Sequence, residues 1–409
     1  MNYTSHNNPE INKKIKSDID YIAGKVASLL GNDLHSVLLC GGFGRGEGSV
    51  VIENGNIHIV NDYDFTIVLN AKNRFHYLSV YRRIHTPLEK LAVSLAEELS
   101  IKQIDLSPKP PGYFKKTNNL KIENYEVKKG HYLVYGKSNP TSSMPDWKAS
   151  DIPLFEGTWL FRNRGTGLLL AALYFMKTKG KIIHNSKKEN FVIECTKAQL
   201  AIGDSILLMH SNYHHLYSNR TDCMNAIDIS EIPHNKKIKP MYQRAVKQKL
   251  TPDFETCFKK DLASWWFDIT DTFNNFFFYY EKKRLQVSFD NWVEYEQICR
   301  KSDKIELKTF VKKLITIGHS GFSIKKIIEA YYRSKKTYSI SLVPLVLFAL
   351  KKDGIDRELM ERAARILKIN LCGDDEKDWV KLSEGVLKEI HPTGEAARIL
   401  AELPDFADN

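Results

Sequence analysis

Two short stretches near the N-terminus decide the fold of this 409-residue chain: CGGFGRGE (Cys40–Glu47) and NDYDF (Asn61–Phe65). The first begins at the end of an apolar run, Val37–Cys40, that is typical of a short buried strand. The second lies inside a longer run, Ile59–Leu69, that indicates another strand. The sequence therefore predicts a strand, a glycine-rich turn and a second strand that carries two acidic residues in its first half, in that order.

The glycine-rich turn has the composition of a phosphate-binding element. Gly41 and Gly42 carry no side chain, so the backbone N–H groups of the turn are open to close approach by phosphate oxygens. A turn that leads from a strand into a helix adds the positive end of the helix dipole. Arg45 follows at once and supplies a cation. We therefore predict that Gly41, Gly42 and Arg45 bind the phosphates of a nucleotide.

The acidic residues of the second stretch are spaced for one face of a strand. Residues two apart in a strand project to the same side, so Asp62 and Asp64 present two carboxylates together. Two neighbouring carboxylates repel each other unless a cation neutralises them, and magnesium suits one or two carboxylates plus substrate phosphates. Asp105 lies in a third predicted strand, Ile101–Leu106, and joins the pair if the strands are adjacent. Three carboxylates predict a site for two metal ions, with Asp62, Asp64 and Asp105 as ligands and catalytic residues.

Gly41-Gly42 followed by Asp62-x-Asp64 and the later Asp105 resembles the polymerase-beta superfamily of nucleotidyltransferases. The glycine-rich string itself resembles that of the uridylyltransferases of bacterial nitrogen regulation. The resemblance covers about the first third of the chain. It implies an α/β head with a mixed sheet, and the helical periodicity of the residues from Trp159 onward predicts an all-helical body after it. The resemblance also implies two Mg²⁺ ions as cofactors and a nucleoside triphosphate such as ATP as donor.

The sequence departs from the superfamily pattern at two places. Many members have Ser after the first glycine, to hold the terminal phosphates, and Gly42 takes that position here. The link between glycines and carboxylates, Gly48–Asn61, is longer than usual. We interpret this link as an inserted hairpin.

The resemblance also suggests nucleotide-binding residues in the helical body. Lys197 resembles the basic residue with which helical domains of the superfamily hold terminal phosphates, and Tyr213 and Arg220 are further candidates. An exposed helix face is the alternative for each of them. His210, His214 and His215 lie close together, but no Glu or Cys completes a zinc set, so a cluster at a helix end is favoured over a metal site.

Hydrophobic periodicity outlines the remaining organisation. It predicts helices over Ile11–Leu30 and Phe75–Leu99, a break at Ser107-Pro108, and a hairpin formed by Tyr125–Val127 and Tyr132–Tyr135. We expect three domains: a nucleotidyltransferase catalytic domain at 1–150, a helical domain at 151–285 that completes the nucleotide and acceptor cleft, and a C-terminal helical domain at 286–409.

Composition constrains the partners. The formal net charge of +11 favours polyanionic partners, but the lysines are dispersed, which is more typical of a solvated surface than of a binding stripe. The N-terminal residues lack the apolar stretch of a signal peptide and the apolar runs are too short to span a bilayer, so we expect a cytoplasmic protein with no membrane partner.

These observations predict magnesium-dependent transfer of a nucleoside monophosphate from a nucleoside triphosphate to a hydroxyl group, with release of pyrophosphate. A small molecule, such as a sugar, or a protein is the favoured acceptor. An RNA end is the first alternative. A catalytically silent nucleotide-binding or interaction protein with the same head is the second.

Overall fold

The computed structural model divides into two compact units. It describes residues 2–409 except 54, 116–119, 137, 180–184, 303–323, 325–326, 328–330, 332–337, 391–399, 401–402 and 404–409. The first unit consists of Met1–Glu156, Ile206–Asp228 and Tyr242–Asp253, and the second of Gly157–Ser205, Ile229–Met241 and Phe254–Asn409. This division differs from the three domains expected at 1–150, 151–285 and 286–409, because two segments from beyond residue 150 pack into the first unit.

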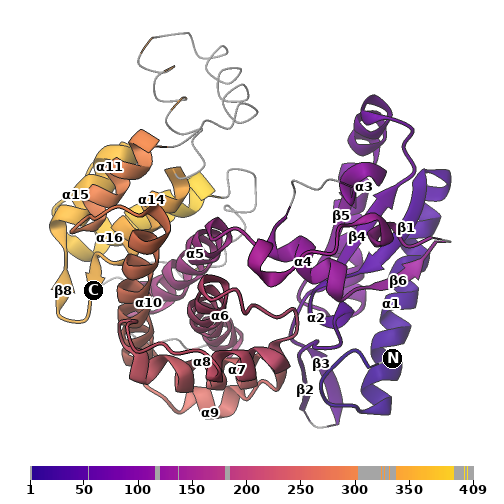
Figure 1. Cartoon of the computed structure of the whole chain (residues 1–409), viewed down its shortest axis with the longest axis horizontal. Helices are drawn as coiled ribbons and strands as arrows, with labels where there is room; N and C mark the ends of the chain where they lie inside the picture. Colours follow the sequence, from indigo (N-terminus) through magenta and orange to yellow (C-terminus); the bar gives the residue numbers. More distant parts are fainter. Residues whose placement is uncertain are drawn as a thin grey trace. The chain divides into compact units, whose positions relative to one another are not determined.

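The first unit is built on a four-stranded mixed sheet in the order β5-β4-β1-β6 (Figure 1). Strand β1 pairs antiparallel with both β4 and β6, whereas β4 and β5 are parallel. The helices and strands of the unit up to residue 156 are α1 (Pro9–Leu30), β1 (Leu34–Leu39), α2 (Gly41–Gly44), β2 (Val50–Glu53), β3 (Asn56–Ile59), β4 (Tyr63–Leu69), α3 (Arg74–Glu98), β5 (Ile104–Lys109), α4 (Ile122–Lys129) and β6 (Tyr132–Tyr135). The predicted α/β class with a mixed sheet is thereby confirmed.

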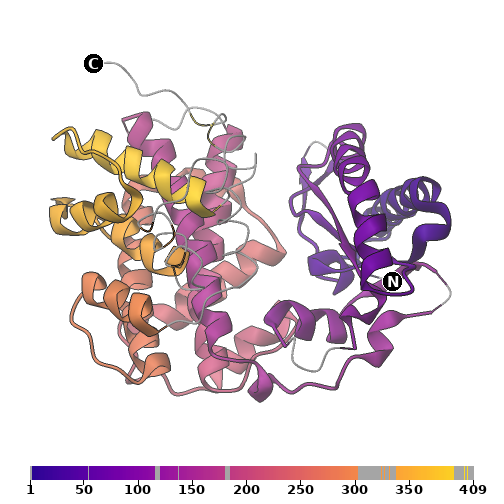
Figure 2. The same cartoon turned by 90° about the horizontal axis from the view of Figure 1, so that it is seen from above.

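Helices α1 and α3 cover one face of this sheet. Helix α1 contacts β1 and β6, α3 contacts β5, and the two helices contact each other (Figures 1 and 2). Alternate residues of β4, including Tyr63, Phe65 and Ile67, enter the core beneath them. Because side chains alternate along a strand, Asp64 belongs to the opposite face of the sheet. The carboxylate face of the sheet is therefore the one that α1 and α3 leave uncovered.

Local signals fix the ends of α1. The Asn8 side chain caps its N-terminus by accepting hydrogen bonds from the backbone N–H groups of Glu10 and Ile11, at 2.9 and 3.3 Å. Gly31 ends the helix with φ +51°, a conformation that favours glycine. The helix observed over Pro9–Leu30 thus agrees closely with the predicted one.

Three predictions about the loops and edges of the sheet meet different outcomes. The inserted hairpin is confirmed, since β2 and β3 form a separate antiparallel pair. The break at Ser107-Pro108 is wrong: β5 continues to Lys109, because an edge strand tolerates a proline that cannot donate to a ladder. The hairpin at residues 125–135 is also wrong. Residues 122–129 form α4, and β6 joins the main sheet instead.

The second unit is mostly helical. Its helices among the described residues are α5 (Phe155–Lys177), α6 (Asn185–Met209), the first part of α8 (Asn235–Leu250), α9 (Phe254–Phe258), α10 (Leu262–Leu285), α11 (Trp292–Ser302), α14 (Tyr338–Leu347), α15 (Arg357–Leu367) and α16 (Asp375–Ile390). Of these, α5 begins within the first unit, and α6 and α8 end within it. A small hairpin, β7 (Leu350–Lys351) with β8 (Gly354–Ile355), corrects the expectation of an all-helical body. Part of the predicted C-terminal domain lies outside the described residues.

Aromatic side chains fill the core of the second unit. Phe161 of α5 stacks on Phe277 of α10, with ring centroids 4.5 Å apart, and Trp266 donates its indole N–H to the carbonyl of Leu168 at 3.0 Å. Helix α14 packs against α11, α15 and α16 (Figure 2). Within the described residues, none of the helices combines the length and apolar character needed to cross a bilayer.

Candidate active site

The carboxylates predicted from sequence lie on, or immediately before, two adjacent strands of the sheet. Asp64 on β4 and Asp105 on β5 are direct partners in the parallel register. Ile104 and Leu106 enter the core under the helices, so Asp105 projects to the same uncovered face as Asp64. Asp62 comes two residues before Asp64, immediately ahead of β4. The strand adjacency on which the Asp105 prediction depended is present.

The glycine turn lies directly against Asp64. Gly41 has φ +60°, and a Cβ atom added there would lie 1.9 Å from Asp64 Oδ2. The backbone N–H of Cys40 also donates to the carbonyl of Asp64 at 2.8 Å, which ties the start of the turn to β4. Gly42 faces elsewhere, since its added Cβ would lie 3.1 Å from the Glu47 carbonyl oxygen. Gly41 is therefore the glycine that leaves room for the Asp64 carboxylate.

The surroundings disfavour a charged Asp64 in the absence of a cation. Burial, together with the nearby Asp62 and Asp105, raises the pKa of the Asp64 carboxyl to about 7, and Lys249 and Arg45 act against this rise. Partial desolvation likewise raises the pKa of Asp105; the nearby Asp62 adds to this rise. Clustered carboxylates with raised pKa values favour a functional site over a structural one, because repulsion between them costs stability.

This donor set fits a hard divalent cation. Magnesium takes oxygen ligands and commonly uses only one or two protein carboxylates, completed by phosphates and water. Asp62 and Asp64 offer such a pair beside a turn that has no side chain at Gly41. Among the described residues, no three His, Cys, Asp or Glu side chains converge into a ready metal-binding group.

Lys249 is a basic residue near the carboxylates that sequence reasoning missed. It lies in the last turn of α8 (Asn235–Leu250), within a segment of the first unit, and its charge acts to lower the pKa of Asp64. Ser49 holds this turn in place: its hydroxyl donates to the Lys249 carbonyl, and its N–H donates to the side chain of Asn61 at 3.1 Å. No local pattern distinguishes Lys249 from the other lysines of that helix.

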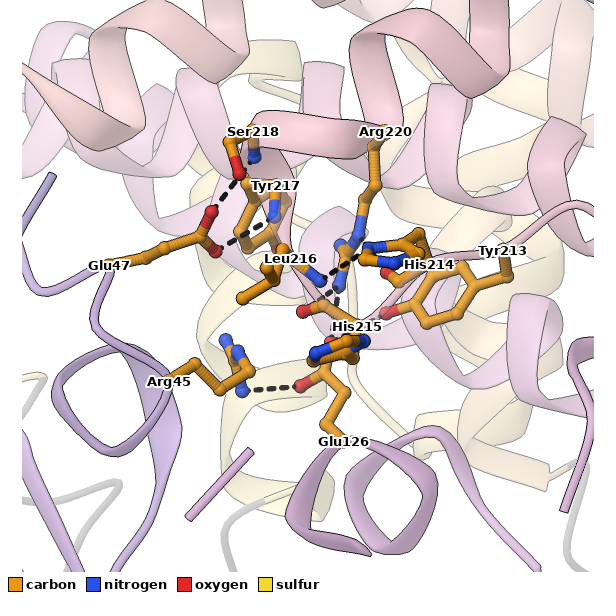
Figure 3. A network of polar contacts seen from close by, with 10 residues as sticks. All are labelled: Arg45, Glu47, Glu126, Tyr213, His214, His215, Leu216, Tyr217, Ser218 and Arg220. Carbon is orange, nitrogen blue, oxygen red and sulfur yellow. Dashed lines mark hydrogen bonds and ion pairs between the residues drawn. The ribbon is translucent and has the colours of Figure 1, made fainter. Parts of the chain in front are cut away.

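Arg45, predicted to bind phosphates, takes part in a buried ionic network (Figure 3). Its Nη1 donates to Glu126 Oε2 at 2.8 Å, and its side chain is 7% exposed. Glu126 Oε1 accepts a short hydrogen bond from Arg220 and another from the Tyr213 hydroxyl at 2.7 Å. Arg45 Nε is buried and has no hydrogen-bond partner in the part of the chain that the structure describes, so one donor of this guanidinium is unsatisfied there.

Electrostatics keep Glu126 ionised. Burial alone would raise the pKa of its carboxyl, but the charges of Arg45 and Arg220 outweigh burial, and the pKa lies below its usual value. Arg220 is fully buried, and its guanidinium lies 3.8 Å from the centre of the Tyr217 ring. Tyr213, the other predicted nucleotide-binding residue, is 3% exposed and belongs to this network. In this network a single carboxylate, that of Glu126, pairs with two cations, Arg45 and Arg220.

Glu47, the last residue of the glycine-rich string, caps a helix. Its two carboxylate oxygens accept hydrogen bonds from the backbone N–H groups of Tyr217 and Ser218, at 2.8 and 2.9 Å, in the first turn of α7 (Tyr217–Asn225) (Figure 3). The Glu47 side chain is buried. Its place in the string was visible in the sequence, but its partner, 170 residues further along the chain, was not.

The remaining candidates lie in ordinary surroundings. Lys197 is on α6 in the second unit, where its Nζ pairs with Glu194 Oε1 at 2.9 Å; its role in nucleotide binding stays a prediction. His214 accepts the N–H of Leu216 on Nδ1, and its ring lies against that of His215, as expected of a cluster beside a helix end.

Comparison of the chain with models of protein families, with curated proteins and with solved structures gives no match in any of the three.

Proposed function

We propose that this protein is a metal-dependent nucleotidyltransferase that transfers a nucleoside monophosphate from a nucleoside triphosphate to a hydroxyl group. One observation carries the proposal: the side-chain-free Gly41 lies against Asp64, and Asp105 is the register partner of Asp64. A phosphate-binding turn and clustered carboxylates at one sheet face are what phosphoryl transfer requires.

Each site residue of the first unit would have its own role in the reaction. Asp62 and Asp64 would hold magnesium, with Asp105 beside them on the edge strand. When bound, the ion neutralises phosphate charge and lowers the pKa of a hydroxyl. The turn at Gly41 offers backbone N–H groups to the triphosphate, and Lys249 and the unsatisfied Nε of Arg45 add positive charge.

The proposed reaction is a substitution at the α-phosphorus of the triphosphate. The acceptor oxygen forms a bond to the α-phosphorus as the bond from that phosphorus to the β-phosphate bridging oxygen breaks. Pyrophosphate leaves with the bond electrons, and the hydroxyl proton passes to a carboxylate or water at the site. Holding both reactants in line beside fixed charges supplies the rate enhancement.

A small molecule or a protein is the acceptor we favour, since the lysines of the chain are dispersed rather than gathered in a stripe. A nucleotide-binding protein without activity is the alternative. Against it stands the electrostatic cost of keeping Asp62, Asp64 and Asp105 together.

The test is transfer of label from each of the four α-³²P ribonucleoside triphosphates, with magnesium, to small hydroxyl compounds, to proteins and to RNA. The variant Asp62→Asn/Asp64→Asn should lose transfer, whereas Asp20→Asn, which changes an exposed carboxylate on α1, should retain it. Equal labelling by the double variant and the wild type would place the activity elsewhere. Binding of a triphosphate without transfer to any acceptor class would support the silent alternative.

A further inference from the structure

The residue before the glycine turn, Cys40, is hydrogen-bonded to β4. The residues after the turn contact segments that come much later in the chain. Arg45, Glu47 and Ser49 alternate along the loop after the turn. Arg45 reaches residues 213–220 through Glu126, Glu47 reaches them directly, and Ser49 reaches the end of α8. All of these residues belong to the first unit.

Two of these side chains belong to residues whose backbones close the turn. The N–H of Glu47 donates to the Gly42 carbonyl at 2.8 Å, and the N–H of Arg45 donates to the Gly41 and Gly42 carbonyls at 3.2 Å. A displacement of the Arg45 or Glu47 side chain would therefore shift a backbone N–H group that is hydrogen-bonded to the turn. Because a Cβ at Gly41 would overlap Asp64, the turn and the carboxylate are in close contact.

The cap at α7 consists of two hydrogen bonds. The Glu47 carboxylate oxygens accept from two successive backbone N–H groups at the helix N-terminus, where negative charge is stabilising. Glu47 is also only 5% exposed as a whole residue, so little water is available to replace the two hydrogen bonds when they break.

We propose that Glu47 is a positioning residue for the nucleotide site, and that the first turn of α7 is part of the frame that holds the glycine turn against Asp64. This inference rests on the proposed function for its kinetic consequence, but its structural consequence is independent of that function. The ion pair of Arg45 with Glu126 supports the same frame from the side of α4.

The experiment compares two helix caps in the full-length protein. Glu47→Gln keeps the shape of the side chain and removes the charge that caps α7. Asp261→Ala removes the cap of α10 in the second unit, where Asp261 accepts the N–H of Ser264 at 3.2 Å. Amide hydrogen exchange is followed in residues 41–48 and 213–220, and kcat and KM for the triphosphate are measured with the acceptor that the transfer assay identifies.

If the proposal is right, Glu47→Gln speeds exchange in both segments by about tenfold and lowers kcat by about tenfold to hundredfold, because small displacements of reacting groups are costly. Asp261→Ala changes neither segment and leaves kcat within about twofold, since its effect is confined to helix stability. Glu47→Ala should exceed Glu47→Gln in both measurements. If that variant does not fold, the graded pair Glu47→Gln and Arg45→Lys gives the same comparison.

Faster exchange in 213–220 alone, with exchange in 41–48 and kcat unchanged, would overturn the proposal and leave Glu47 as an ordinary cap. Coupled exchange in a protein that transfers nucleotide to no acceptor would uphold the frame while rejecting the transferase. The experiment can therefore reject the positioning role of Glu47 and the transferase activity independently of each other.

Discussion

Asp105 on β5 is the direct register partner of Asp64 on β4. The two residues come from different strands, and a long helix, α3, lies between those strands in the chain. Their juxtaposition, with Asp62 ahead of β4, creates a face of like charge that a divalent cation would stabilise.

Magnesium should stabilise the wild-type protein through this face. We expect its thermal midpoint to rise in millimolar Mg²⁺ and the midpoint of Asp64→Asn to stay unchanged, because linkage stabilises only the state that binds. In the presence of a chelator, Asp64→Asn should be as stable as the wild type or more stable, by up to about 1 kcal/mol, since a repulsion is removed. Differential scanning fluorimetry with and without the ion decides this. An equal magnesium shift in both proteins would exclude Asp64 as a ligand.

The crowding at Gly41 gives a second prediction. Gly41 and Gly55 both have positive φ, but only a Cβ at Gly41 meets another group. Gly55→Ala should cost about 1 kcal/mol of stability, the ordinary penalty of a left-handed residue. Gly41→Ala should cost at least about 2 kcal/mol more, because its methyl group overlaps the Asp64 carboxylate. Urea denaturation of both variants measures the difference, and equal losses would contradict the contact.

The buried ion pairs of Glu126 predict a large effect on stability. Glu126→Gln leaves the two guanidiniums of Arg45 and Arg220 without their anion, and we expect a loss of about 3–5 kcal/mol in the free energy of unfolding. Asp146→Asn is the matched control. It breaks an exposed pair with Lys129 and should cost less than about 1 kcal/mol. Similar values for the two variants would show that the network contributes little.

His215 should make stability depend on pH. Burial and the neighbouring His214 lower the pKa of His215 to about 4, against 6.5 for the unperturbed group. The folded protein therefore favours the neutral ring, so this contribution is complete above about pH 6.5 and is lost as the pH falls towards about 4. His215→Gln should lose less stability than the wild type between about pH 7 and 5. Denaturant titrations at both pH values test this, and parallel losses would contradict it.

Salt dependence separates an RNA acceptor from a small one. If RNA binds, several lysines contact phosphates, and affinity should fall at least about tenfold between about 50 and 200 mM salt. A small acceptor predicts a shallow response, set by the triphosphate alone. We expect the shallow response, because the positive charge of the chain is dispersed. Filter binding of total RNA over this salt range measures the affinity, and a labelling assay shows whether RNA ends accept the nucleotide. Tight RNA binding that weakens steeply with salt, together with labelled RNA ends, would contradict our expectation.

The sequence by itself determined the local elements of the first unit and the chemistry they carry. Apolar spacing of three and four residues predicted α1, and alternation in β4 put Tyr63 and Phe65 on one face and Asp64 on the other. The glycine string, the inserted hairpin and the spacing of the carboxylates are also local features of the sequence. Each depends on neighbours in the chain, so each was visible without the fold. The prediction failed at the end of β5, where an edge position tolerates Pro108, and at α4, which is a helix where one strand of a hairpin was predicted.

Only the tertiary structure decided what stands opposite these residues. The register of β4 with β5, the return of residues 213–220 and of α8 to the glycine loop, and the burial of Arg45 against Glu126 all join segments far apart in sequence. Charge alone could not distinguish Lys249 from the other lysines, nor show that Arg45 pairs with Glu126. Long-range packing sets which charges are desolvated and which are paired, and no local pattern encodes that outcome.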